Sequence, residues 1–250
     1  MSGRYRKPLG YLTAVAILLG GWQLLSLALQ SPALPGPAEA LPLFVQLAPE
    51  LLPHGVLSLA RVLAAMAIGT VLAVPLGLAV GRSEKADAIF APLMFLTYPV
   101  PKVVFLPVLL VLFGLGNASK VVLIALIIFF QILLTARDAA KAVPPGAVLS
   151  VCSLGAGRLD IARHVVFPAA LPEIFTALRI GTGTAVAVLF FAESIAGTDG
   201  LGWFIIDAWG LIGYPRMFAG ILAMALMGVL LYEALDALEA VTTRWRRAGR

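Results

Sequence analysis

Residues 62–81 read VLAAMAIGTVLAVPLGLAVG, and no charged side chain lies between Arg61 and Arg82. A helix of about 20 apolar residues is long enough to cross the hydrocarbon core of a bilayer. Backbone polar groups in hydrocarbon must bond to one another, and the sequence lacks the short alternating strands of a barrel. This stretch therefore predicts a membrane-spanning helix.

The composition of the whole chain supports the same class. Of its 250 residues, 61% are hydrophobic and only 12% are charged, with a mean hydropathy of +1.00. A soluble domain is about 25% charged. The net charge of +5 could favour nucleic acid, but the charges lie between the apolar runs, as membrane topology requires. We expect an all-α polytopic protein surrounded by membrane lipid, without a nucleic-acid partner.

Six apolar runs follow one another along the chain. We expect spans at about 9–29, 56–80, 88–115, 121–136, 175–195 and 217–235. The third run is interrupted by four prolines, which break helices and free backbone groups: Pro92, Pro99, Pro101 and Pro107. The sequence therefore predicts six transmembrane helices, the third of them broken.

The first run admits a second interpretation. Ala38-Glu39-Ala40 has the small-x-small pattern of a signal peptidase site. The run is longer than the 7–15 residues of a typical signal core, so we favour a retained span. A proline-rich stretch follows, and we expect the short apolar segment that ends at Pro53 to lie along the membrane surface.

The basic residues orient these spans. Cytoplasmic loops carry an excess of Lys and Arg, and a cytoplasmic N-terminus places 14 of the 18 on that side, beginning with Arg4. The exceptions are Arg61, Lys102, Lys120 and Arg216. We expect both termini in the cytoplasm and Arg61 and Arg216 as anchors at the membrane interface. Aromatic side chains of the outer loop fit an interfacial belt: Trp203, Trp209 and Tyr214.

The organisation expected from these spans has three parts. Residues 1–55 hold the first helix and a periplasmic segment. Residues 56–240 hold a core of five helices with a cytoplasmic loop at 137–173, and residues 241–250 form a basic tail.

The loop at 137–173 is the longest polar segment of the chain. Gly155 and Gly157 interrupt it, and residues 158–164 can form a short helix. Pro168 and Pro172 limit the continuation of that helix into the next span. A short helix with both polar and apolar side chains, mounted on rigid spans, suits docking to a soluble partner.

This loop resembles the cytoplasmic signature of binding-protein-dependent importer permeases, Glu-Ala-Ala, three residues, Gly, nine residues, Ile-x-Leu-Pro. Gly155 takes the glycine position, and residues 165–168 (Val-Val-Phe-Pro) take the place of Ile-x-Leu-Pro. The sequence departs from the signature at residues 149–151, where Leu-Ser-Val replaces Glu-Ala-Ala. That departure removes a charge and leaves the Gly-to-Pro part intact.

Further stretches extend the resemblance over nearly the whole chain. They are residues 34–39 (LPGPAE), 106–107 (LP), 113–120 (FGLGNASK), 192–194 (AES) and 200–202 (GLG). Together they are similar to the sulfonate, taurine, nitrate and bicarbonate branch of these importers. The resemblance implies a type I ABC importer permease fold, like that of the methionine importer, in a bacterial cytoplasmic (inner) membrane.

The resemblance also implies partners. Two ABC ATPase subunits would dock at the loop, an extracytoplasmic solute-binding protein would deliver a small anionic solute, and a second permease copy would complete the pathway, with a homodimer favoured over a heterodimer. The coupling segment so implied is Ser153, Leu154, Gly155, Ala156, Gly157, Arg158, Leu159, Asp160, Ile161, His164 and Pro168. The chain has no Gly-x4-Gly-Lys-Ser/Thr phosphate loop. We therefore expect ATP and Mg in the ATPase, and no catalysis or cofactor here.

Polar residues within the spans are candidates for the pathway or its gate. Glu193 lies near the end of the fifth run, where a carboxylate is costly unless it faces a partner or a cavity; an interfacial position is the alternative. Lys102 follows Pro99 and Pro101, where a broken helix can line a cavity, although its side chain could equally reach the headgroups. Cys152 is the single cysteine, and His54 and His164 lack metal-ligand spacing, so no metal site is expected.

Three other classes of protein compete with the importer interpretation. A secondary transporter or channel would need ion-coupling groups within the spans, and few ionisable residues lie there. A membrane enzyme would need clustered His, Asp or Glu at one membrane face. A passive anchor would not need the proline-broken third span.

Overall fold

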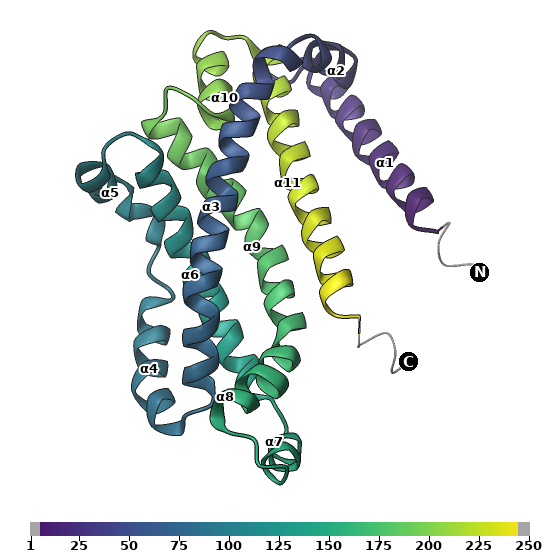
Figure 1. The fold of residues 1–250 in the computed structure, drawn as a ribbon. Helices are drawn as coiled ribbons and strands as arrows, with labels where there is room; N and C mark the ends of the chain where they lie inside the picture. The colour runs from purple at the N-terminus through teal and green to yellow at the C-terminus, as the bar shows by residue number, and fades with distance from the viewer. Residues whose placement is uncertain (1–5, 245–250) are drawn as a thin grey trace.

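The computed structural model describes residues 6–244, all of them in helices or their connections (Figure 1). Arg4 and the last six residues of the expected basic tail lie outside the described residues. The helices are α1 (Arg6–Leu29), α2 (Pro37–Gln46), α3 (Ala48–Gly81), α4 (Glu84–Thr97), η1 (Lys102–Phe105), α5 (Leu106–Phe113), α6 (Asn117–Lys141), α7 (Pro145–Cys152), α8 (Arg158–Ile161), the π-helical η2 (Ala162–Val166), α9 (Phe167–Ala196), α10 (Leu201–Gly210) and α11 (Tyr214–Thr242).

The helices confirm an all-α membrane protein. Five are long and apolar enough to cross a bilayer, and the pair from Glu84 to Phe113 makes up to a sixth, bent by 79° at its break. The break lies at Tyr98–Pro101, where the sequence predicted an interruption. Two prolines in this short stretch each lack a backbone N–H, so an unbroken helix cannot form there.

The centre of the bundle is packed with apolar side chains from α3, α6 and α9. Val62, Leu123, Ile128, Ile132 and Leu189 have no exposed surface. α3 and α6 approach closely where α3 carries glycine: a Cβ atom would lie 2.6 Å from the Leu133 carbonyl oxygen at Gly77 and still closer to the Arg137 carbonyl oxygen at Gly81. The close contact is therefore specified by small residues, as in many membrane bundles.

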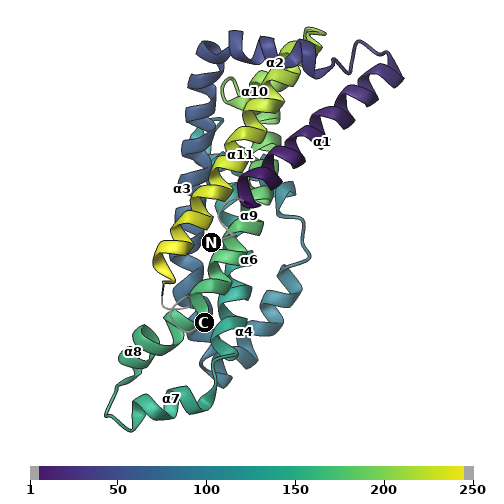
Figure 2. The same cartoon turned by 90° about the vertical axis from the view of Figure 1, so that its right-hand side faces the viewer.

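The bundle has two distinct ends. α2 and α10 cap one end, and α7 and α8 form the other (Figures 1 and 2). α1 runs toward the α2 end, and α11 runs back from it toward the α7–α8 end. The two described terminal helices therefore begin and end on the same side, and their assignment to the cytoplasm stays a prediction.

α1 is attached to the side of the bundle rather than built into it. The Trp22 ring stacks on Phe218 of α11 with centroids 5.4 Å apart, and the Tyr11 hydroxyl donates to Glu233 at 2.7 Å. No residue of Gly10–Leu29 is buried within the chain. This apolar helix therefore presents most of its surface to lipid or to another protein.

Two helix boundaries differ from the sequence prediction because prolines are accommodated. α3 begins at Ala48 and continues through Pro53, so the segment expected along the membrane surface is divided between the end of α2 and the first turns of α3. At the other end of the molecule, η2 and α9 continue through Pro168 and Pro172 without the expected break. Pro168 lies in the first turn of α9, directly after a π-helical turn, and such a turn re-registers the hydrogen bonds that the proline ring would disrupt.

Three short helices were not predicted from the sequence. α2 lies in the proline-rich stretch, α7 at the start of the polar loop and α10 in the outer loop. Proline at the first helical positions of α2 and α7 favours their initiation. In α10, Trp203 packs against the core and Trp209 is exposed, so only part of the expected aromatic belt faces outward.

Candidate functional site

A buried polar network joins α3, α6 and α9 at the α2–α10 end of the bundle. Glu193 has no exposed surface and Arg61 is 3% exposed. Arg61 Nη1 lies 2.6 Å from Glu193 Oε1, and Nη2 lies 2.5 Å from Asp199 Oδ1. The same guanidinium donates from Nε to Asn117 Oδ1 at 2.8 Å. One arginine therefore connects two carboxylates and an amide from different elements.

Glu193 also fixes the turn between α9 and α10. Its carboxylate accepts hydrogen bonds from Ser58 Oγ at 2.8 Å and from the backbone N–H of Gly202 at 2.8 Å. Ser58 in turn accepts from the N–H of Leu201, and His54 Nδ1 accepts from the N–H of Gly200 at 3.1 Å. These bonds tie the start of α10 to α3.

Glycine is required where this turn meets the carboxylate. Gly200 has φ +95°, a left-handed conformation that other residues adopt at a cost. A Cβ atom at Gly202 would lie 2.8 Å from the Cβ of Glu193. The two glycines of Gly-Leu-Gly at 200–202 therefore allow the backbone to approach the Glu193 side chain closely.

The network corrects the expectation that Arg61 anchors the chain at the membrane interface, and it shows what surrounds Glu193. Arg61 is not an anchor at the headgroups, because its charge is buried and paired with Glu193. Glu193 is surrounded by donors from within the chain and does not open to solvent. The signal for Arg61 was present in the sequence, since His54, Ser58 and Arg61 recur at spacings of four and three and so share one helix face.

The lysine at the break of the third span is satisfied by backbone carbonyls. Lys102 Nζ donates to the carbonyls of Thr97 and Tyr98, both at 2.8 Å, and of Val100 at 3.2 Å. It also lies 4.6 Å from the centroid of the Phe130 ring. Lys102 thus caps the end of α4, while Pro99 and Pro101 form the break itself.

Lys120, one of the basic residues expected outside the cytoplasmic loops, is a further buried cation. It is 1% exposed, and its ammonium donates to the carbonyls of Leu115 at 2.9 Å and Gly116 at 3.3 Å. It therefore closes the connection from α5 to α6. The sequence signal for this role is the position of Lys120, four residues after Gly116 of the Gly-Leu-Gly stretch at 114–116.

The loop expected to dock a partner protrudes from the opposite end of the bundle. α7 leads to a turn at Gly155, which has φ +82°, and α8 follows. Leu154 and Leu159 are 87% and 81% exposed. The Asp160 carboxylate accepts from the N–H of Gly157 at 3.0 Å, so it caps α8. The loop therefore presents apolar side chains on a fixed turn.

This loop is anchored to the spans on its inner side. Val166 packs with Ala140 and Val143 in a small buried cluster. Nearby, Asp87 of α4 accepts from Arg137 Nε at 2.5 Å and from Lys141 Nζ at 2.6 Å. Val166 thus fixes the helical segment that follows the loop to the end of α6, while Gly155 and His164 stay exposed and Pro168 lies in the first turn of α9.

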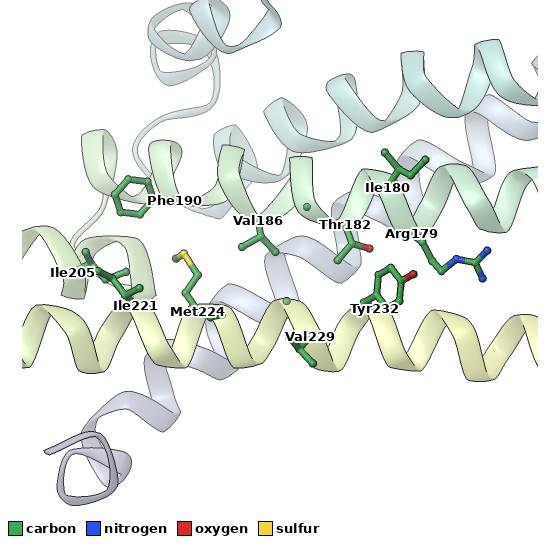
Figure 3. A pocket seen from close by; sticks show the side chains of 13 residues that line it. Arg179, Ile180, Thr182, Val186, Phe190, Ile205, Ile221, Met224, Val229 and Tyr232 are labelled. Carbon is green, nitrogen blue, oxygen red and sulfur yellow. The ribbon is translucent and has the colours of Figure 1, made fainter. Parts of the chain in front are cut away.

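One face of α9 is exposed between two grooves. A groove of about 610 Å³ separates it from α11, with Val186, Met224 and Tyr232 pointing into it and Arg179 at one end (Figure 3). A second groove of about 600 Å³ separates α9 from η1 and α5. The residues on the face between them recur at helical spacing: Ile180, Thr184, Ala187, Phe191 and Ile195.

Metal ligands are not clustered in the part of the chain that the structure describes. No group of three His, Cys, Asp or Glu side chains could hold an ion. Cys152 is exposed on α7.

Comparisons with known proteins agree with this architecture. Residues 65–244 match the family described as "Binding-protein-dependent transport system inner membrane component". The chain is 35% identical over 241 residues to the taurine transport system permease protein TauC of Escherichia coli (strain K12), covering 93% of this chain and 88% of that protein. It is 27% identical to the putative aliphatic sulfonates transport permease protein SsuC of Bacillus subtilis (strain 168), covering 97% and 91%.

A solved structure shares the fold. The inward-facing MetNI methionine ABC transporter (the SeMet soak crystal form) matches with a TM-score of 0.66 and 21% identity, over 79% of this chain and 98% of the matched chain. The match confirms the methionine-importer-like arrangement of helices expected from the sequence.

Proposed function

The chain belongs to the family of inner-membrane components of binding-protein-dependent transport systems, and from that premise we propose that it conducts a small anionic solute of the sulfonate or taurine type. As a member of this family it is a multi-pass permease subunit of an ABC importer in the inner membrane. The names of two relatives, one a taurine permease and one a putative sulfonate permease, support the choice of solute.

The observation that carries the proposal is the exposed loop of α7 and α8. Leu154 and Leu159 project into solvent from a turn fixed by Gly155, at the end of a rigid bundle. Exposed apolar side chains on an ordered protrusion are typical of a docking element. In this proposal each copy of the loop, including Ser153, Ala156, Arg158, Ile161, His164 and Pro168, docks in one of two ATPase subunits, which bind ATP and Mg.

The pathway in this proposal lies between two permease copies. The interior of one bundle is filled by fully buried apolar side chains such as Ile128 and Ile132. The exposed face of α9, with a groove on either side, offers an alternative surface. A second copy facing it would enclose a passage, and a homodimer needs no further gene product.

The residues singled out in the spans take supporting parts in this proposal. Pro99, Pro101 and Lys102 shape the broken third span beside the α5–α9 groove. Glu193 acts on the gate indirectly, by holding the α9–α10 turn in place. Residues 56–240 form the transporting core, residues 1–55 an outer helix and periplasmic segment, and 241–250 a cytoplasmic tail, although the first boundary falls inside α3.

The proposed cycle follows from this arrangement. ATP binding draws the two ATPases together, their surfaces move the α7–α8 loops, and the continuous helix from Arg158 to Ala196 transmits the movement to the opposite end. A solute-binding protein delivers the solute there. Hydrolysis reverses the movement.

Uptake measurements test the proposal. A strain lacking this chain should lose ATP-dependent uptake of radiolabelled taurine or an alkanesulfonate and regain it with the wild-type gene. Normal sulfonate uptake without the chain would contradict the solute. Uptake that persists when ATP is depleted and follows the proton gradient would instead favour a secondary transporter.

A further inference from the structure

A groove of about 720 Å³ lies between the cytoplasmic end of α3 and the run of α8, η2 and the start of α9. Three arginines line it: Arg82 after α3, Arg158 of α8 and Arg163 of η2. Throughout residues 6–244, none of the three forms an ion pair with a carboxylate; Arg82 has one long contact, 3.5 Å, to the Ala140 carbonyl. The groove therefore concentrates positive charge that the protein does not neutralise.

Acidic side chains nearby do not cancel this charge. Asp160 lies on the same short helix as Arg158, but its carboxylate faces the N–H of Gly157. Asp87 is held by Arg137 and Lys141. Glu84 is exposed two residues after Arg82 and does not line the groove.

The floor of the groove is apolar. Val74, Pro75, Leu78 and Ala79 of α3 line one side, and Val166 and Phe167 line the other. From Val74 to Arg82 the helix rises by about 12 Å at 1.5 Å per residue. The apolar lining therefore runs from the arginines into the membrane-spanning part of α3.

We propose that this groove binds an anionic phospholipid of the cytoplasmic leaflet, with its phosphate among Arg82, Arg158 and Arg163 and part of an acyl chain along Val74, Leu78 and Ala79. Basic pockets between helices at the cytoplasmic face recognise anionic headgroups, and guanidinium groups bind phosphate in a fork geometry. This inference rests on the cytoplasmic placement of the loop.

We infer a lipid as the occupant because the three arginines lie beside an apolar groove floor on α3. An acidic side chain of a soluble partner would use the arginines but would not need an apolar floor that continues into the bilayer. A small soluble anion would not need it either. Because Arg158 belongs to α8 of the docking loop and Arg163 to the η2 turn that follows it, a bound lipid would connect the position of that loop to the composition of the membrane.

The transporter is purified in the assembly in which it is isolated and titrated separately with phosphatidylglycerol and with phosphatidylcholine. Bound lipid is counted by native mass spectrometry. The Arg158→Gln/Arg163→Gln variant should bind phosphatidylglycerol about 25-fold more weakly, because each arginine near an anionic headgroup contributes roughly a factor of five. Ala79→Trp should also reduce binding, by filling the floor while leaving every charge in place.

Matched controls make each outcome informative. Lys85→Gln/Arg244→Gln removes two charges outside the groove, and Ala67→Trp places the same ring on another exposed position of α3; both should retain the lipid. Equal binding of the two lipids, or equal loss in the Lys85→Gln/Arg244→Gln control, would overturn the proposal.

Two further results would also overturn it. Loss of the ATPase with unchanged lipid binding in the arginine variant would assign the charges to an acidic protein surface. Displacement of the lipid phosphate by inorganic phosphate, with no effect of Ala79→Trp, would assign them to a soluble anion. Lipid counts do not depend on solute uptake, so failure here and failure of the proposed function are distinguishable.

Discussion

Removal of the buried Arg61 side chain should be one of the most damaging single changes in this protein. Arg61→Leu leaves Glu193, which has no exposed surface, with only the neutral donors of Ser58 and Gly202. Breaking a buried ion pair by removing one partner costs about 3–5 kcal/mol. Asp199 adds little to this cost, because its side chain is 46% exposed and can be hydrated.

The loss is measurable as a shift in thermal midpoint. For a chain of this size, each kcal/mol corresponds to about 2–4 °C, so Arg61→Leu should lower the midpoint of the detergent-solubilised protein by roughly 6–20 °C. Arg61→Leu/Glu193→Leu should recover much of that loss, because replacing both partners of a buried pair by apolar residues is often nearly neutral.

The matched control is Arg216→Leu, which removes another arginine near the same end of the bundle, where it pairs with the exposed Glu50. That change should shift the midpoint far less, because exposed pairs contribute about 0–1 kcal/mol. The same small effect of Arg61→Leu and Arg216→Leu would contradict a buried, paired Arg61, as would a double variant no more stable than Arg61→Leu alone.

Three further changes test other parts of the structure. Gly77→Leu should destabilise the protein by about 1–3 kcal/mol or more through overpacking of α3 against α6, whereas Gly183→Ala, with open space around it, should not; thermal unfolding compares them. Asp87→Asn should lower the thermal midpoint more than Asp138→Asn, because Asp87 holds both Arg137 and Lys141, and equal shifts would contradict this. Gly155→Val should abolish uptake and ATPase association, although the backbone strain of a valine at positive φ is only roughly 1–2 kcal/mol. Gly155→Asn should retain both, because asparagine tolerates positive φ. Unchanged uptake in Gly155→Val would count against the docking role.

The spans could be predicted because charge is so rare in this sequence. The gap between Arg61 and Arg82 marks most of α3, and the prolines near residue 100 mark the break between α4 and η1. These features act locally, through hydrophobicity and the missing proline N–H. The sequence therefore contains enough information to place them without knowledge of the packing.

The short helices and the polar network could not be predicted in the same way. α7 and α10 are only 8 and 10 residues long, too short for hydrophobic periodicity to identify. The partners of the network are remote in sequence, since Arg61 and Glu193 are 132 residues apart. The spacing of His54, Ser58 and Arg61 indicates a shared polar helix face. It does not indicate the partner of Arg61, because pairing between remote charges is decided by helix packing.

The docking of an ATPase at the α7–α8 loop is the central claim, and the single cysteine provides a direct test. Cys152 is exposed on α7, so a photoreactive maleimide attached there in native membranes will capture whatever lies against the loop. A control moves the label to the other end of the bundle, as Cys152→Ser with Ile212→Cys. We predict that the Cys152 adduct contains a protein with a Gly-x4-Gly-Lys-Ser/Thr phosphate loop and that the control adduct does not. Capture of lipid alone at Cys152, or the same products from both positions, would contradict the account.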